Sequence, residues 1–228
     1  VYIMLDDAGY GDFSCFGQKK FKTPNVDRMA REGMMLTDFY SSSTVCAPSR
    51  GSLMTGFHTG HGFIRGNKEI RPEGQYPLPL KANTIPEVLK TVGYVSGMFG
   101  KWGLGFPGSE GDPMNQGFDR FYGLNCHRQS HNFYPSHVWS DREKVPLGRS
   151  HYSRSLVADE CLKFIRQNKE NPFFCYVPFT IPHAAMQSPE DRIAPWRKKF
   201  PEFEKVTGFY GGATITNPVA AFAAMMEH

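Results

Sequence analysis

A short run in the first quarter of the chain combines a cysteine, a proline and an arginine. Residues 46–56 read Cys-Ala-Pro-Ser-Arg-Gly-Ser-Leu-Met-Thr-Gly. Proline is preorganised for the first turn of a helix, so Cys46 is predicted at or just before a helix N-terminus. Backbone N–H groups and the helix dipole attract anions there. Arg50, one turn further on, can reach back and bind a tetrahedral oxyanion. The run therefore predicts a reactive side chain inside a site for sulfate or phosphate.

Two adjacent carboxylates, Asp6 and Asp7, end an apolar run at the start of the chain. Like charges at the end of a buried strand are costly unless a cation or hydrogen bonds compensate them. An oxygen-preferring divalent ion, Ca²⁺ or Mg²⁺, would supply that compensation. For such a pair taken alone, an exposed turn that caps the next element is the commoner arrangement.

Single basic residues follow two other apolar runs. Lys101 lies between glycines after the first of them and could present a point charge to an anion. His183 follows the most apolar run of the chain and could donate a hydrogen bond to an anion or a leaving group. Taken singly, an isolated lysine is more often a solvated surface residue, and a lone histidine is more often a structural hydrogen bonder.

The elements that must position these residues alternate between strand and helix. Buried strands are expected at 1–5, 34–39, 94–99 and 173–179, and helices at 23–33, 46–56, 84–93, 155–168 and from 217 onwards. This alternation with short links predicts an α/β fold, with a mostly parallel central sheet flanked by helices. Ligands of such sheets bind beyond the carboxyl ends of the strands. Asp6 and Asp7, Lys101 and His183 all follow expected strands, so they could converge on one edge of the sheet.

Residues 102–154 form the exception, because they show no clear periodicity and are rich in Gly, Pro, aromatic residues and His. Long loops in compact domains are usually functional or disordered, and the aromatic content argues against disorder. Either His127 or His131 could line a pocket here, or simply be exposed. Aromatic side chains between 121 and 139 could stack on sugar rings, or could equally pack the loop against the protein; they are Phe121, Tyr122, Phe133, Tyr134 and Trp139.

Length and composition exclude several classes of protein. With 228 residues and a net charge of +4, the chain can bury a sizeable core, and its scattered basic residues make nucleic acid an improbable partner. No apolar run approaches the length of a membrane span. The five cysteines lack zinc-like spacing, and Cys161 and Cys175 are expected to be buried as small hydrophobic side chains.

Four motifs in this order resemble one family, the type I, formylglycine-dependent sulfatases of the alkaline-phosphatase-like superfamily. Residues 46–50 and 53–56 look like the signature of that family, and residues 6–12 resemble its opening metal motif. Residues 100–102 resemble its second signature, and residues 182–183 resemble its downstream histidine segment. The resemblance extends over essentially the whole chain.

The resemblance implies a specific chemistry. Cys46 is oxidised after synthesis to formylglycine by a maturating enzyme, and one hydroxyl of the hydrated aldehyde attacks sulfur. Asp6 and Asp7 hold a divalent cation, Ca²⁺ or also Mg²⁺, with the converted Cys46 as a further ligand. Arg50 stabilises the hydrated formylglycine. Lys101 binds sulfate oxygens, and His183 binds sulfate or helps the leaving oxygen depart. His131 contacts the formylglycine hydroxyl; His127 is the alternative for that contact and a further substrate-binding residue.

Two departures from the family pattern accompany the resemblance. Gly103 stands where the second signature of the family often continues with a histidine. An Asp-Asn (or Asp-His) metal pair and a second lysine of the family have no counterpart within this sequence. We therefore expect residues 1–228 to be the N-terminal portion of a sulfatase catalytic domain, inactive by itself.

The implied activity is hydrolysis of a sulfate monoester, with a sulfated small molecule or carbohydrate as substrate. A phosphomonoester or phosphonate monoester hydrolase of the same fold is the nearest alternative. A binding domain whose cysteine is never converted is a second alternative, and a thiolate or redox role for Cys46 is a third. The family implies a periplasmic, extracellular or lumenal location.

Overall fold

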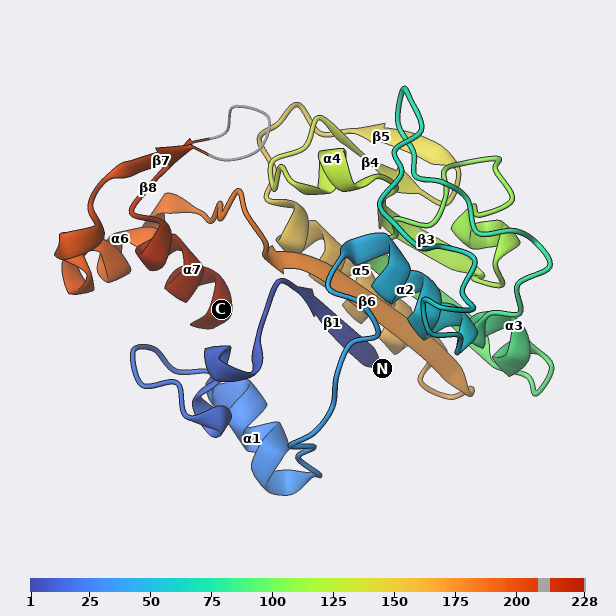
Figure 1. Cartoon of the computed structure of the whole chain (residues 1–228), viewed down its shortest axis with the longest axis horizontal. Helices are drawn as coiled ribbons and strands as arrows, with labels where there is room; N and C mark the ends of the chain where they lie inside the picture. Colours follow the sequence, from blue (N-terminus) through green and yellow to red (C-terminus); the bar gives the residue numbers. More distant parts are fainter. Residues whose placement is uncertain (209–213, 228) are drawn as a thin grey trace. The chain divides into compact units, whose positions relative to one another are not determined.

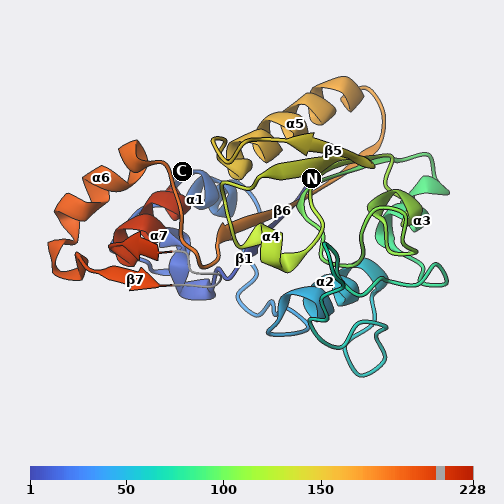
Figure 2. The same cartoon turned by 90° about the horizontal axis from the view of Figure 1, so that it is seen from above.

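The computed structural model describes residues 1–208 and 214–227. The chain forms two compact units. The first unit comprises residues 1–4, 41–130 and 134–180, and the second comprises residues 5–40, 131–133 and 181–228. Figures 1 and 2 show the same chain in two orthogonal views.

A six-stranded sheet is the centre of the first unit. Its strands lie in the order β1-β6-β2-β3-β4-β5. Their bounds are β1 (Tyr2–Asp6), β2 (Val95–Lys101), β3 (Arg120–Leu124), β4 (His137–Ser140), β5 (Glu143–Pro146) and β6 (Phe173–Pro182). Strand β2 pairs in parallel with both β6 and β3, whereas β4 and β5 add an antiparallel hairpin at one edge. The predicted α/β fold with a parallel centre is confirmed.

Helices cover the two faces of this sheet. Helix α2 (Cys46–Thr55) and helix α5 (Ser153–Asn168) lie on opposite sides of it, as Figure 2 shows. Side chains alternate along each strand, because successive residues of a strand point to opposite faces. On β2, Met98 packs in the core below α2 and the next residue, Phe99, packs in the core below α5. Two apolar layers therefore enclose the central strands.

Gly100 allows the three central strands to approach closely just before Lys101. Its φ is +134°, a conformation that side chains disfavour, and a Cβ atom there would lie 2.2 Å from the carbonyl oxygen of Pro178 on β6. On the other side, a Cβ at Gly123 of β3 would lie 1.9 Å from the oxygen of Gly100. Any larger residue at these points would push the strands apart, so the end of β2 is fixed by glycines.

Local sequence signals start and end the remaining elements of the first unit. Glu87 accepts a 2.8 Å hydrogen bond from the backbone N–H of Thr84, and this caps the start of helix α3. Gly56, with φ +73°, ends α2 and donates to the carbonyl of Ser52 at 2.8 Å. The other short elements are α3 (Ile85–Lys90), the 3₁₀ turn Pro113–Asn115 and α4 (His127–Ser130).

The second unit has its own core. Helices α6 and α7 pack against each other, with Ile193 and Trp196 of α6 contacting an alanine-rich face of α7. Phe21 from the N-terminal part of the unit joins the same cluster. The elements of this unit are the 3₁₀ turns Tyr10–Asp12, Ser14–Phe16 and Pro201–Phe203, the helices α1 (Pro24–Glu32), α6 (Glu190–Lys199) and α7 (Pro218–Glu227), and the hairpin of β7 (Val206–Gly208) with β8 (Thr214–Thr216).

Two expectations for secondary structure are wrong. The strand expected at 34–39 does not form, and Met34, Leu36 and Phe39 are exposed because no neighbouring strand of the described chain covers them. The stretch 102–154 is not one long loop, since it contains β3, the β4–β5 hairpin and α4. The expectation of a buried strand at residues 1–5 is only partly right. Strand β1 forms there, but it is an edge strand on which Ile3 is exposed.

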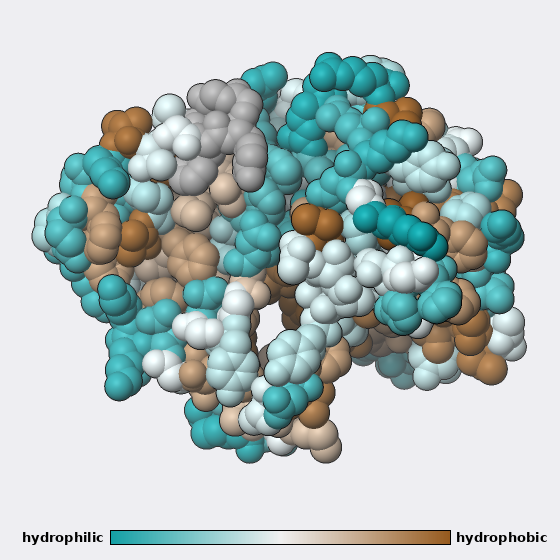
Figure 3. All heavy atoms as spheres, viewed as in Figure 1, coloured by the Kyte–Doolittle hydropathy of each residue, from teal (hydrophilic) through white to brown (hydrophobic). Residues whose placement is uncertain are grey.

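Hydrophobic residues on the visible face of the molecule form separate patches among hydrophilic ones, as Figure 3 shows. Within the described residues, each helix is too short or too polar to cross a lipid bilayer.

Candidate active site

Cys46 is the first residue of helix α2, as the sequence predicts. Val45 before it has an extended conformation, and its carbonyl oxygen accepts from the N–H of Ser49 at 3.2 Å. The N–H of Ala47 donates to Oδ1 of Asn67 at 2.9 Å, which fixes the first turn against the following loop. Cys46 therefore lies at the positive end of a ten-residue helix dipole.

Lys101 lies directly against this cysteine within the first unit. It is the last residue of β2, its side chain is completely buried, and its Nζ lies 3.3 Å from Sγ of Cys46. The alternative of a solvated surface lysine is therefore wrong. Burying an ammonium group is costly unless negative charge or hydrogen bonds accompany it. Lys101 is thus placed to bind an anionic group on the Cys46 side chain or on a ligand beside it.

Arg50 connects helix α2 with the end of β2. Its guanidinium is buried, and Nη1 donates to the backbone carbonyl of Lys101. Because this arginine is one turn from Cys46, its positive charge adds to that of Lys101 on the same side of the helix start. Two buried cations beside the helix end that carries Cys46 favour an anionic ligand there.

His127 lies in the first unit, beside the chain that follows β2. It begins α4, is buried, and its backbone N–H donates to Oε1 of Gln75 at 3.3 Å. The N–H groups of Trp102 and Gly103 bond to the carbonyls of Leu124 and Asn125, so the chain after β2 runs beside the chain after β3. The His127 ring consequently lies over Gly103: a Cβ atom there would be 2.3 Å from Nε2.

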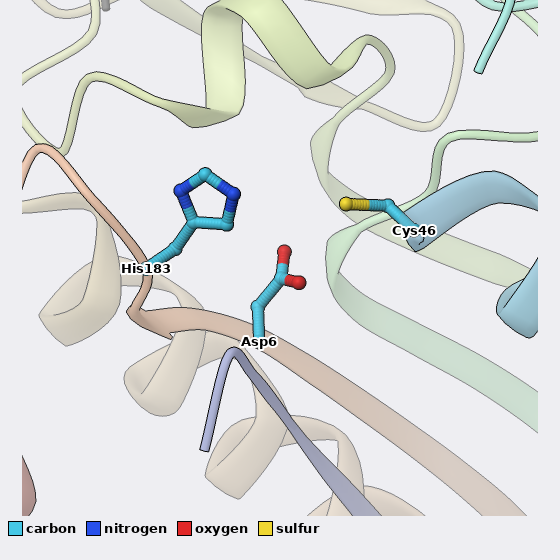
Figure 4. A group of neighbouring side chains, drawn as sticks. All are labelled: Asp6, Cys46 and His183. Atoms are coloured by element: carbon cyan, nitrogen blue, oxygen red, sulfur yellow. The ribbon is translucent and has the colours of Figure 1, made fainter. Parts of the chain in front are cut away.

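The second unit contains the predicted metal-binding carboxylates Asp6 and Asp7 and two candidate histidines, His131 and His183. Asp6, the last residue of β1, is 7% exposed, and one of its oxygens lies within 4.8 Å of a ring nitrogen of His183. Asp7 is mostly exposed, and its Oδ2 lies 3.3 Å from Nε2 of His183. Figure 4 shows the Asp6 carboxylate at the end of β1 and the ring of His183 just after β6.

His131 lies beside His183 within this second unit. Their rings stack with centroids 4.1 Å apart and an angle of 12° between the planes. The sequence left open which of His127 and His131 is in the site. The structure places them in different units, with His127 beside Gly103 of the first and His131 against His183 of the second.

Most of the aromatic side chains of 121–139 are core residues. Phe121, Tyr122 and Phe133 are buried, and Trp139 donates from Nε1 to Glu73 at 2.6 Å. For the three buried side chains, packing rather than sugar stacking is therefore the correct interpretation. Sequence reasoning missed Asn67 and Gln75, which hold Ala47 and His127, because single polar residues in irregular segments carry no local signal.

Comparison with known proteins shows the family of the chain. The family profile described as Sulfatase matches residues 1–226. N-acetylgalactosamine-6-sulfatase of Canis lupus familiaris is 34% identical over 206 residues, which are 81% of this chain and 39% of that protein. Arylsulfatase A of Homo sapiens is 44% identical over 127 residues, which are 54% of this chain and 24% of that protein.

A solved structure supports the same relationship at the level of the fold. The structure of BT4656 in complex with its substrate D-glucosamine-2-N,6-O-disulfate superposes with a TM-score of 0.72 and 24% identity, and the match covers 92% of this chain and 38% of that one. The chain thus shares the mixed α/β fold of that structure, built around a mostly parallel sheet. Within this fold, the chain belongs to the sulfatase family. The chain spans about two fifths of the length of N-acetylgalactosamine-6-sulfatase of Canis lupus familiaris.

Proposed function

We propose that the gene product containing this chain hydrolyses sulfate monoesters through a formylglycine derived from Cys46. The observation that carries the proposal is the helix-end position of Cys46, with the buried Lys101 Nζ 3.3 Å from its sulfur. The match of the Sulfatase profile to residues 1–226 supports the same reaction.

The proposed steps balance on the side chain of residue 46. One hydroxyl of the hydrated aldehyde attacks sulfur while the alcohol oxygen departs, which leaves a sulfate ester on the side chain and a free alcohol. The second hydroxyl then loses its proton, the C=O bond re-forms, and sulfate leaves. A water molecule then adds to the aldehyde and restores the diol for the next turnover. Lys101 and Arg50 stabilise the negative charge of the sulfate oxygens and of the attacking hydroxyl. His183 supplies the proton that the leaving oxygen needs.

A divalent cation fits the donor groups of the chain. Asp6 is a buried carboxylate at a strand end, and carboxylate oxygens are the ligands that Ca²⁺ and Mg²⁺ prefer. We propose that Asp6, Asp7 and the converted Cys46 hold the ion, with Ca²⁺ as the first choice. When bound, it would add positive charge next to the sulfate oxygens and lower the pKa of a hydroxyl nearby.

A sulfated carbohydrate is the proposed class of substrate. The support is the name of one relative, N-acetylgalactosamine-6-sulfatase, and the disulfated glucosamine in one structure of the same fold. A maturating enzyme that converts Cys46 is the proposed protein partner.

Paired kinetics test the reaction class. The gene product that contains this chain, produced in a host that converts such cysteines, should hydrolyse 4-nitrophenyl sulfate with kcat/KM at least about tenfold above that for 4-nitrophenyl phosphate, a difference of about 1.4 kcal/mol in transition-state binding. Faster turnover of the phosphate would support the phosphomonoester alternative. A second assay, sulfate release from sulfated monosaccharides measured by ion chromatography, tests the substrate class; release from aryl sulfates alone would contradict it.

Gly103 offers a test of His127. Gly103→Ala should lower kcat/KM for an aryl sulfate by roughly tenfold to a hundredfold, because the new Cβ would displace the His127 ring from its place. Gly108→Ala is the matched control: Gly108 has φ +81° against +80° for Gly103, yet a Cβ there meets nothing within 4 Å. Both variants carry the same backbone strain, so an equal loss of activity in both would argue against a role for His127. In a His127→Ala background, Gly103→Ala should have little further effect.

A further inference from the structure

Two buried cysteines face each other between a helix and a strand of the first unit. Cys161 lies on α5 and Cys175 on β6, and their Sγ atoms are 3.4 Å apart. Both thiols are free in this structure, with exposures of 7% and 0%. The proposed sulfatase reaction uses neither residue.

We propose that Cys161 and Cys175 are a disulfide-forming pair that cross-links α5 to β6 when the protein folds in the presence of a small-molecule disulfide such as oxidised glutathione. A disulfide bond is about 2.05 Å long, so the two sulfurs need to approach by roughly 1.4 Å. Their surroundings favour a compact apolar cross-link, since both residues belong to the core cluster that includes Phe99, Val157 and Val177.

The position of the pair in the chain also favours the cross-link. Cys161 and Cys175 are 14 residues apart, and they flank the turn between the end of α5 at Asn168 and the start of β6 at Phe173. Chain connectivity already keeps this helix and this strand near each other during folding. The cross-link would therefore close a short ring of native structure and restrict the unfolded chain.

Cys161 is the thiol that we expect to react first. The interaction with Cys175 lowers the pKa of the Cys161 thiol, while the interaction with Cys161, with burial added to it, raises the pKa of Cys175. Cys161 is also the more exposed of the two. The thiolate of Cys161 is therefore the expected nucleophile.

The exchange balances in two steps. The Cys161 thiolate attacks one sulfur of oxidised glutathione, which forms a mixed disulfide and releases one glutathione thiolate. Cys175 then loses its proton, attacks Sγ of Cys161, and releases the second glutathione. Two protein thiols are thereby oxidised to one disulfide, and one glutathione disulfide is reduced to two thiols.

Peptide mapping tests the proposal on the gene product that contains this chain. The protein is refolded in a glutathione redox buffer, alkylated under denaturing conditions without reduction, and digested with trypsin. Because Lys163, Arg166 and Lys169 separate the two cysteines, cleavage yields peptide 155–163 and peptide 170–192. We expect these two peptides to appear joined, with a mass about 2 Da below their sum. Reduction should separate them.

Matched variants test which cysteines form the disulfide. Cys15→Ser, which removes a cysteine of the second unit, should leave the joined peptides unchanged, whereas Cys161→Ser and Cys175→Ser should each abolish them. Alkylation of both Cys161 and Cys175 as free thiols in the oxidised wild type would overturn the proposal. So would a disulfide from either residue to a different cysteine. Because the wild type itself gives the decisive readout, poor folding of a variant does not weaken the test.

Discussion

Cys46→Ala is expected to reduce the turnover of an aryl sulfate by about 10⁴-fold or more, since the residue provides the only atom that would bond to sulfur in the proposed reaction. The variant is made in the gene product that contains this chain and is assayed with saturating 4-nitrophenyl sulfate. Cys15→Ala is the control, because Cys15 and Cys46 are both partly exposed cysteines. Activity within tenfold of the wild type in Cys46→Ala would rule out the proposed nucleophile.

Cys46→Ser separates the formylglycine route from direct attack by a side chain. A serine hydroxyl can accept the sulfate group, but it has no second hydroxyl whose proton loss could expel it. We therefore expect the substrate to transfer its sulfate group to residue 46 of this variant. The protein should become about 80 Da heavier and should not turn over further substrate. In the wild type, the peptide that contains residue 46 should be about 18 Da lighter than the cysteine form, as conversion to formylglycine requires. A fully unmodified thiol in active protein would instead indicate a thiolate mechanism.

Asp6→Asn is expected to cause the second large loss, roughly 10³-fold in kcat, because the substitution removes the buried charge that the proposed cation needs. The change keeps the shape of the side chain, so packing at the end of β1 is preserved. Asp12→Asn is the control, since the Asp12 carboxylate accepts locally from the N–H of Gly9 at 2.7 Å.

Metal binding gives a readout that does not depend on activity. At a Ca²⁺ concentration a hundredfold above Kd, binding should stabilise the wild type by about 2.7 kcal/mol, seen as a rise in Tm. Asp6→Asn should lose this rise and Asp12→Asn should keep it. If Ca²⁺ and Mg²⁺ leave the Tm of the wild type unchanged while chelators leave its activity unchanged, the proposed ion is wrong.

Elements with strong local signals were predictable from the sequence. Helix α2 was predicted because a proline near its start and a glycine after its end act within a few residues. The central strands β2 and β6 were predicted because their apolar runs reflect burial on both faces of a parallel sheet. The strand expected at 34–39 shows the limit of this reasoning, since a strand also needs a neighbour to pair with.

Helix α6 was missed for a related reason. It contains Pro195 and many charged residues, so its local sequence favours neither a helix nor a buried position. Its stability comes from Ile193 and Trp196, which pack against α7. The hairpin of β4 and β5 was also missed, because its short strands depend on pairing with β3 at the edge of the sheet.

For the site, residue types and their spacing were enough to predict the chemistry of the groups. They identified a cysteine at a helix start, an arginine one turn further on, a carboxylate pair at a strand end and a lysine after an apolar run. These are local properties, because residue type and spacing decide them. The burial of Lys101 against Cys46, and the position of His127 beside Gly103, could be seen only in the folded chain. Both facts depend on how closely strands from distant parts of the sequence approach, and glycines such as Gly100 set that distance.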